Sequence, residues 1–213
     1  MRNKNLNIKK ILKQSWEMLM DNFFFLFIIL IIILGFDMAS SYFLDFLKDY
    51  SAPLLLRLSA LLILSLVDIL LYLGTIKISL DLLQGKKPQL DDLFSCYNKL
   101  MRQVVAEILY FFIVLGGLLL FIIPGFIWII KYQFMVYFIV DKDMQATEAL
   151  KASGKLTKGY KWNIFFYDII IGLLNILGVL LFGVGLFFTL PISILALSKI
   201  YKNLLSIQKE KIF

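Results

Sequence analysis

Five ionisable residues stand inside long apolar stretches of the chain and are the first candidates for chemistry. They are Asp37, Asp68, Glu107, Lys131 and Asp168. An ionised side chain within a bilayer costs about 2.5 kcal/mol or more, so such groups normally pair or face a polar cavity. Lys131 and Asp68 fall near the middle of their stretches, and we expect them to form an ion pair. That pair could fix how two helices pack, or it could line a polar pathway or a lipid-headgroup site.

Histidine and cysteine chemistry is nearly absent. The chain contains no His and a single Cys, Cys96. The usual general base and the commonest metal ligand are therefore missing, and one Cys cannot form an internal disulfide. No nucleophile stands beside the carboxylates, so we expect no enzyme, no cofactor and no metal site. Cys96 is expected to be a small buried hydrophobe rather than a lipidation site.

The composition is that of an integral membrane protein. Of the 213 residues, 61% are hydrophobic and 17% are charged, whereas soluble domains have about 45–50% apolar and about 25% charged residues. The net charge of +7 fits attraction to anionic lipid better than nucleic-acid binding, because no basic patch with interleaved aromatics lies outside the membrane-flanking segments. We predict a bacterial cell-membrane protein whose partners are lipids of the anionic leaflet, with a protein partner or a homo-oligomer as a further expectation and no nucleic acid.

Six apolar stretches are predicted to be transmembrane helices. They cover residues 23–44, 54–83, 103–123, 125–140, 162–181 and 186–201. The second, at about 45 Å, exceeds a ~30 Å hydrocarbon core and must tilt or protrude. A signal peptide is the alternative for the first, but the long amphipathic leader and the later spans favour a helix that stays in the membrane. The connections within the pairs are a polar loop at 45–53, a turn at Pro124 and Gly125, and a turn at 183–185.

An amphipathic segment precedes each pair of spans. Residues 5–22 and 90–101 repeat apolar side chains at helical spacing, and a third such helix is expected to be capped by Asp143. The first of these could lie on the leaflet or dock onto the protein. Each unit of one amphipathic helix and two spans would make a three-fold repeat over 1–83, 84–140 and 141–213, with chance similarity as the alternative.

The basic residues predict the orientation. Of the 22 Lys and Arg residues, 18 lie in the N-terminal segment, the second and fourth connections and the tail. By the positive-inside rule these segments and both termini are cytoplasmic. The predicted fold is therefore all-α: one polytopic transmembrane domain over 1–213, with six transmembrane helices and three cytoplasmic amphipathic helices.

Two motifs carry a family resemblance. The stretches IIPGFIWIIK and EALKASGKLTKGYKW resemble bacterial integral membrane proteins grouped as glycerophosphoryl diester phosphodiesterase membrane-domain-like, together with related membrane families of unknown function. The matching residues are Pro124, Gly125 and Lys131 in the first element, and Ala149, Leu150, Ser153, Leu156, Thr157 and Gly159 in the second. The sequence departs from that pattern at Lys131, where Arg is more common, and at Gly154, where an aromatic is common. The phosphodiesterase's catalytic domain is absent, so the resemblance implies no such activity.

Two functions fit these observations. The first is a non-enzymatic multi-pass membrane protein that organises lipids or partner proteins at the cytoplasmic leaflet. The alternative is a small transporter or channel with a polar path lined by Lys131 and the intramembrane carboxylates. We favour the first, because the predicted spans show no Gly or Pro break near the midplane and Pro191 is the one residue expected to interrupt a span.

Overall fold

The computed structural model describes residues 7–120, 122–181 and 183–212, and all regular structure in them is helical. The start of the amphipathic segment predicted at 5–22 and residue 121 of the third predicted span lie outside these residues, as do the side chains of Lys209 and Lys211 in the basic tail. The elements are α1 (Ile8–Asp21), α2 (Phe23–Asp49), α3 (Leu54–Leu83), the 3₁₀ helices η1 (Leu90–Leu93) and η2 (Tyr97–Lys99), α4 (Leu100–Leu120), α5 (Ile122–Tyr132), α6 (Met135–Lys142), α7 (Ala146–Leu156), α8 (Lys161–Leu180) and α9 (Leu186–Ile212). Six helical stretches among them are long and apolar enough to cross a membrane, which indicates a multi-pass membrane protein.

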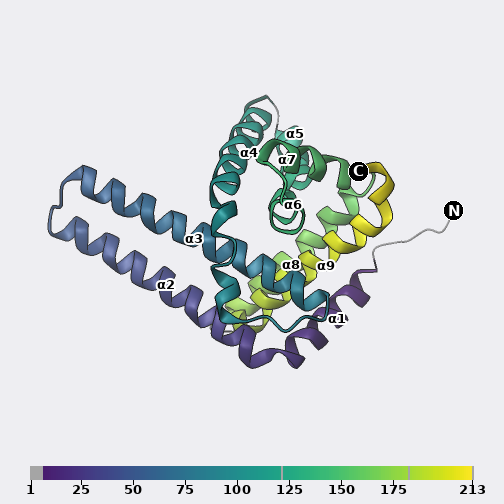
Figure 1. Cartoon of the computed structure of the whole chain (residues 1–213), viewed down its shortest axis with the longest axis horizontal. Helices are drawn as coiled ribbons and strands as arrows, with labels where there is room; N and C mark the ends of the chain where they lie inside the picture. The colour runs from purple at the N-terminus through teal and green to yellow at the C-terminus, as the bar shows by residue number, and fades with distance from the viewer. Residues whose placement is uncertain (1–6, 121, 182, 213) are drawn as a thin grey trace.

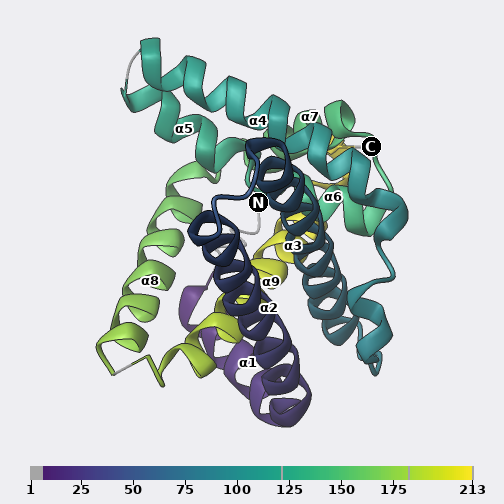
Figure 2. The same cartoon turned by 90° about the vertical axis from the view of Figure 1, so that its left-hand side faces the viewer.

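Six helices form three hairpins, α2 with α3, α4 with α5 and α8 with α9 (Figures 1 and 2). The hairpins diverge from one region of the molecule, which we call the base. The α2/α3 hairpin is an arm that reaches away from the rest of the molecule, to the left of Figure 1. Figure 2 shows this arm end-on, with the tips of the other two hairpins pointing apart. The short helices α6 and α7 lie at the base.

Several predicted spans form as expected. The second span is α3, with the predicted bounds, and the fifth and sixth correspond to α8 and α9, the latter extending to Ile212. The first span is longer than predicted, because α2 continues through Asp49 and shortens the loop to 50–53. Lys48 and Asp45, three residues apart, form an ion pair of 2.7 Å within this added part of the helix, as opposite charges at this spacing can do.

The centre of the molecule is α6. All six residues from Met135 to Val140 are buried, and α6 packs against α3, α4 and α7. The rings of Phe138 and Tyr201 meet edge to face at 5.2 Å between centroids, which brings α9 onto the same core. A helix that is apolar on every side is normally buried in the core, and α6 is buried in this way from Met135 to Val140.

The amphipathic helix predicted at 90–101 does not form. Two 3₁₀ helices, η1 and η2, occupy this stretch, and the chain bends between them to bury Leu93 and Cys96 against the rest of the protein. Gly74 of α3 allows this close approach, because a Cβ there would collide with the backbone of Leu93. The burial of Cys96 is confirmed. The three-unit repeat stays a prediction, since this connection is unlike the other two.

Helix α1 docks onto the protein along α9. Its apolar stripe, with Ile11 and Leu19 buried, faces inward, whereas Lys9 and Lys13 are exposed. The sequence allowed α1 either to lie on the leaflet or to dock onto the protein. In the structure its apolar face docks onto the protein. Contact of the basic face with a leaflet stays a prediction.

Candidate functional site

The fourth predicted span is broken. Instead of one helix over 125–140, α5 ends at Tyr132 and α6 begins at Met135, with Gln133 and Phe134 in a turn between them. A break in a segment this apolar leaves backbone N–H and C=O groups that water cannot satisfy, so other protein groups must bind them.

Helix α7 supplies those groups. The Ser153 hydroxyl donates to the carbonyl oxygen of Lys131 at 2.9 Å and accepts from the N–H of Phe134 at 3.2 Å. One hydroxyl can donate once and accept twice, so Ser153 bridges both sides of the break. The Thr157 hydroxyl lies 3.3 Å from the same Lys131 oxygen and 3.1 Å from the carbonyl oxygen of Ser153. Two motif residues therefore hold the broken span in place.

The other residues of the second motif pack α7 or let the chain turn. Ala149, Leu150 and Leu156 are buried against the core. Gly159 has φ of 86° in the connection to α8, a conformation that glycine adopts without steric cost.

The first motif lies inside a helix rather than at the turn. Pro124 and Gly125 belong to the first turn of α5, which runs from Ile122 to Tyr132. Proline is tolerated there because first-turn N–H groups have no helical acceptor. Gly125 packs directly on α4, where a Cβ would overlap the side chain of Leu118. The hairpin is confirmed, but the predicted position of its turn is wrong by a few residues.

A lysine-lined cavity of about 600 Å³ lies between α4, α5 and α7, and we call it the lysine pocket. It is lined by Leu109, Ile113, Lys131, Tyr132, Thr147, Leu150, Lys151, Gly154, Lys155 and Lys158. Four of these side chains are cationic, and none of the described lining residues is acidic. The arrangement combines concentrated positive charge with an apolar wall, which suits an anion attached to an apolar body.

Lys131 is held within this pocket. Its Nζ lies 4.7 Å from the centroid of the Tyr132 ring, a cation–π distance. Gly154 leaves room for it, because a Cβ at that position would come 3.0 Å from Lys131 Cε. The two departures from the family pattern, Lys131 and Gly154, are thus neighbours in space.

The predicted Lys131–Asp68 ion pair does not form. Asp68 of α3 has a carboxylate, Asp37 of α2, as its charged neighbour. Helix α5 packs chiefly on α4, α7 and α8, so Lys131 faces α7 rather than α3. Among the described residues, no ion pair involves Lys131.

The remaining predicted carboxylates are also separate from Lys131. Glu107 accepts a hydrogen bond from Gln103 on its own helix, at 3.0 Å. Asp168 of α8 lies next to Gln133 in the break. The hydroxyl of Tyr167, the residue before Asp168, is buried and has no hydrogen-bond partner among the described residues. The five candidates from the sequence therefore do not form one constellation, and the lysine pocket is the site that the structure adds.

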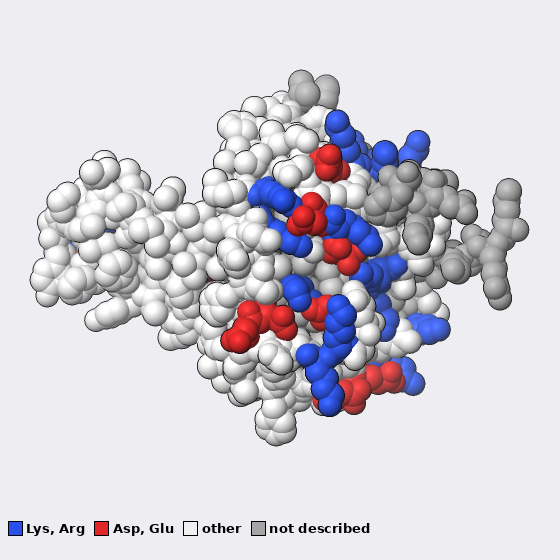
Figure 3. All heavy atoms as spheres, viewed as in Figure 1, with Lys and Arg blue, Asp and Glu red and all other residues white. Residues whose placement is uncertain are grey.

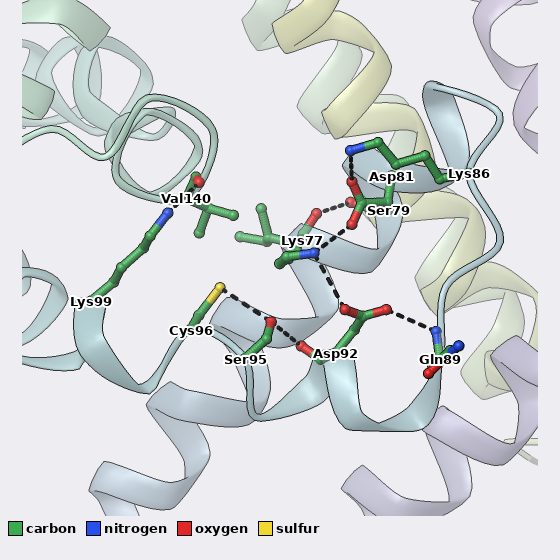
Figure 4. Close-up of polar contacts among 11 residues, drawn as sticks. Lys77, Ser79, Asp81, Lys86, Gln89, Asp92, Ser95, Cys96, Lys99 and Val140 are labelled. Atoms are coloured by element: carbon green, nitrogen blue, oxygen red, sulfur yellow. Dashed lines mark hydrogen bonds and ion pairs between the residues drawn. The ribbon is translucent and has the colours of Figure 1, made fainter.

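Ion pairs fasten α3 to the segment that follows it (Figure 4). Lys77 contacts Asp81 at 2.6 Å and Asp92 at 3.3 Å, and Lys86 contacts Asp81 at 3.0 Å. The spacing of Lys77 and Asp81, one helical turn apart, was visible in the sequence. The contact of Lys77 with Asp92 could not be predicted, because it depends on how the chain folds back along α3.

Further ion pairs surround the end of α6. Asp141 accepts from Lys202 of α9 at 2.6 Å. Asp143 pairs with Arg102 at 2.8 Å, and this hydrogen bond from the guanidinium lowers the pKa of Asp143. Asp143 does not cap α7 as predicted: it has φ of 54° and ends α6. The cap of α7 is Gln145, which forms a capping box with Glu148.

The charges collect on one part of the molecule. Figure 3 shows Lys, Arg, Asp and Glu over the base, on the right, whereas the visible face of the arm, on the left, is almost entirely white. Asp81, Asp92, Asp141 and Asp143 are engaged by the ion pairs just described. Three lysines of the lysine pocket, Lys151, Lys155 and Lys158, are exposed.

Comparison with known proteins places the chain in a family. A domain of unknown function (DUF7847) matches residues 93–207, a range that contains α4 to α8 and every residue of the lysine pocket. No curated protein and no solved structure matches significantly. None of these comparisons links the chain to the phosphodiesterase-associated family that its motifs resemble. Because the match covers more than half of the 213 residues, the chain belongs to the DUF7847 family.

Proposed function

We propose that this protein is a non-enzymatic, multi-pass protein of the bacterial cell membrane that binds anionic phospholipid headgroups at the cytoplasmic leaflet and so organises lipid around itself. The observation that carries the proposal is the lysine pocket. Four lysines without a described carboxylate among them face a cavity of about 600 Å³, and such a site attracts a phosphate group.

The pocket's position supports a lipid ligand. It opens beside Leu109 and Ile113 of α4, a helix apolar enough to span the bilayer. The same base carries most of the basic residues, and these predict the cytoplasmic side. The distant resemblance to the phosphodiesterase-associated membrane family is compatible with this role but adds no residue to it.

Lipid binding by purified protein tests the proposal. Phosphatidylglycerol and phosphatidylcholine are compared by native mass spectrometry with wild type and with Lys151→Gln/Lys155→Gln. Each lysine near such a surface contributes about 1 kcal/mol, so the double variant should bind phosphatidylglycerol about thirty-fold more weakly.

The matched control is Lys9→Gln/Lys10→Gln on the exposed face of α1, which removes the same charge elsewhere. It should bind within about twofold of wild type. Equal losses in the two double variants would show that net charge, and not the lysine pocket, holds the lipid.

The transporter reading remains the second candidate because the fourth span is broken next to Lys131 and Asp168 (α5 and α6). Transporters bind ligands at such discontinuous helices. Against it, Lys131 and the carboxylates do not share one path in the described residues. A flux assay in liposomes that detects movement of an ion or a small solute, absent in a Ser153→Ala variant that loses the hydroxyl bridging the break, would favour this candidate.

A further inference from the structure

A second cavity lies on another side of α5. It is a groove of about 350 Å³ between α5 and α8. Ile127 and Ile130 of α5 form one wall, and Trp162 and Phe165 of α8 form the other. Lys161 is the one charged residue among those that line it. We call it the α5/α8 groove.

The residues that line the α5/α8 groove and the lysine pocket are near neighbours in sequence at two places. Ile130 lines the groove and the next residue, Lys131, lines the pocket. Likewise Lys158 lines the pocket, and Lys161, three residues later, lines the groove. Both cavities therefore reach the end of α5 and the start of α8, which places them within the length of one phospholipid molecule.

The walls of the groove show what class of group it accepts. Both helices are parts of stretches apolar enough to span a membrane, and Trp162 is 73% exposed and Phe126, another lining residue, 54%. An apolar, laterally open groove in such a segment meets hydrocarbon rather than water. Its cationic rim lies beside the lysine pocket, where the headgroup would sit.

We infer that the α5/α8 groove holds one acyl chain of the lipid whose anionic headgroup occupies the lysine pocket. The inference rests on the proposed function and restricts the class of ligand. The ligand is a long-chain anionic phospholipid, because a soluble phosphate compound would fill the pocket and leave the groove unused.

Filling the groove tests this. Ile127→Trp places a large side chain in the groove, and Leu62→Trp, at a 60% exposed position of the arm, is the matched control. Dioleoyl phosphatidylglycerol is titrated by native mass spectrometry, and glycerol 3-phosphate, as a headgroup without chains, by calorimetry. Ile127→Trp should weaken lipid binding about tenfold or more and leave glycerol 3-phosphate within about twofold, and Leu62→Trp should change neither.

The outcomes separate the two proposals. Wild-type lipid affinity in Ile127→Trp would overturn the acyl-chain inference while leaving the lysine pocket intact. If wild type binds neither phosphatidylglycerol nor glycerol 3-phosphate, the proposed function itself is overturned.

A second measurement covers the case in which Ile127→Trp loses thermal stability. Wild type is photolysed with phosphatidylglycerol that carries a diazirine at the chain end. Adducts should concentrate on residues 123–130 and 162–165, and an even spread that includes the α2/α3 arm would contradict the inference.

Discussion

At the scale of single residues, Ser153 shows what the sequence could and could not reveal. The motif containing it was recognisable, and its burial follows from helical spacing. Its partners, the Lys131 carbonyl and the Phe134 N–H, could not be predicted. Every residue of an apolar run offers the same backbone groups, so the sequence does not show which of them Ser153 binds. The same holds for Lys131: its type indicated a functional residue, but its neighbours depend on the direction in which α5 faces.

Ser153→Ala should destabilise the protein by about 1–3 kcal/mol, because it leaves the buried N–H of Phe134 without an acceptor. Thermal unfolding in detergent measures this. The control is Ser206→Ala on α9, whose exposed hydroxyl bonds to the carbonyl of Asn203 in the preceding turn at 2.8 Å and should cost less than about 0.5 kcal/mol. Similar losses in both variants would mean that Ser153 does not support the break.

The stability effects of Lys131→Met and Asp68→Leu should add. The two groups form no ion pair, and separated sites are additive within about 0.5 kcal/mol. The double variant's melting temperature, compared with the sum of the single shifts, is the test. Recovery of stability in the double variant, as expected when both partners of a buried pair are replaced, would instead restore the pairing predicted from the sequence.

At the scale of elements, hydrophobic length predicted best. Helices α3, α8 and α9 begin within a residue of the expected positions, since each is a long apolar run between charged or Gly-containing ends. Prediction failed where tertiary contacts decide. The stretch 90–101 has helical spacing but is bent by the packing of Leu93 on Gly74. The break between α5 and α6 has no Gly or Pro to announce it, because α7 and not the local sequence stabilises it.

Leu19→Ala should lower stability by about 2–5 kcal/mol, the usual cost of truncating a buried leucine. Leu19 is 1% exposed where α1 meets the core. The neighbouring Met20 is 40% exposed, so Met20→Ala should cost under about 1 kcal/mol. Chemical denaturation in detergent gives both values. A small effect at Leu19 would indicate that α1 leaves the core and lies on the membrane surface instead.

At the scale of the whole molecule, the sequence predicted a membrane protein with six apolar helices, and the structure has them. The splaying of three hairpins from one base was not predictable, because apolar length carries no information about the direction of a span. The same limit applies to the site. The four lysines of the lysine pocket come from α5, from α7 and from the connection after it, and their convergence requires the break that tips α6 into the core.

Cysteine labelling tests the orientation. In a Cys96→Ala background, Lys48→Cys and Val184→Cys at two hairpin tips should react with a membrane-impermeant maleimide added to intact cells. Lys87→Cys and Lys155→Cys at the base should react only after the cells are opened. The positive-inside rule gives the reason, and labelling of the base positions in intact cells would reverse the proposed topology.

The burial of α6 also imposes an order on how the protein is made. Its six consecutive apolar residues and the Asp141 carboxylate acquire their covering partly from Tyr201 and Lys202, which the ribosome adds about 60 residues later, three to twelve seconds at ~5–20 residues per second. During that interval α6 can already pack on α3 and α4, but it lacks the contacts that α9 makes with it. Part of the surface of α6 therefore stays uncovered until α9 is made, so completion of the last helix is the event that closes the core.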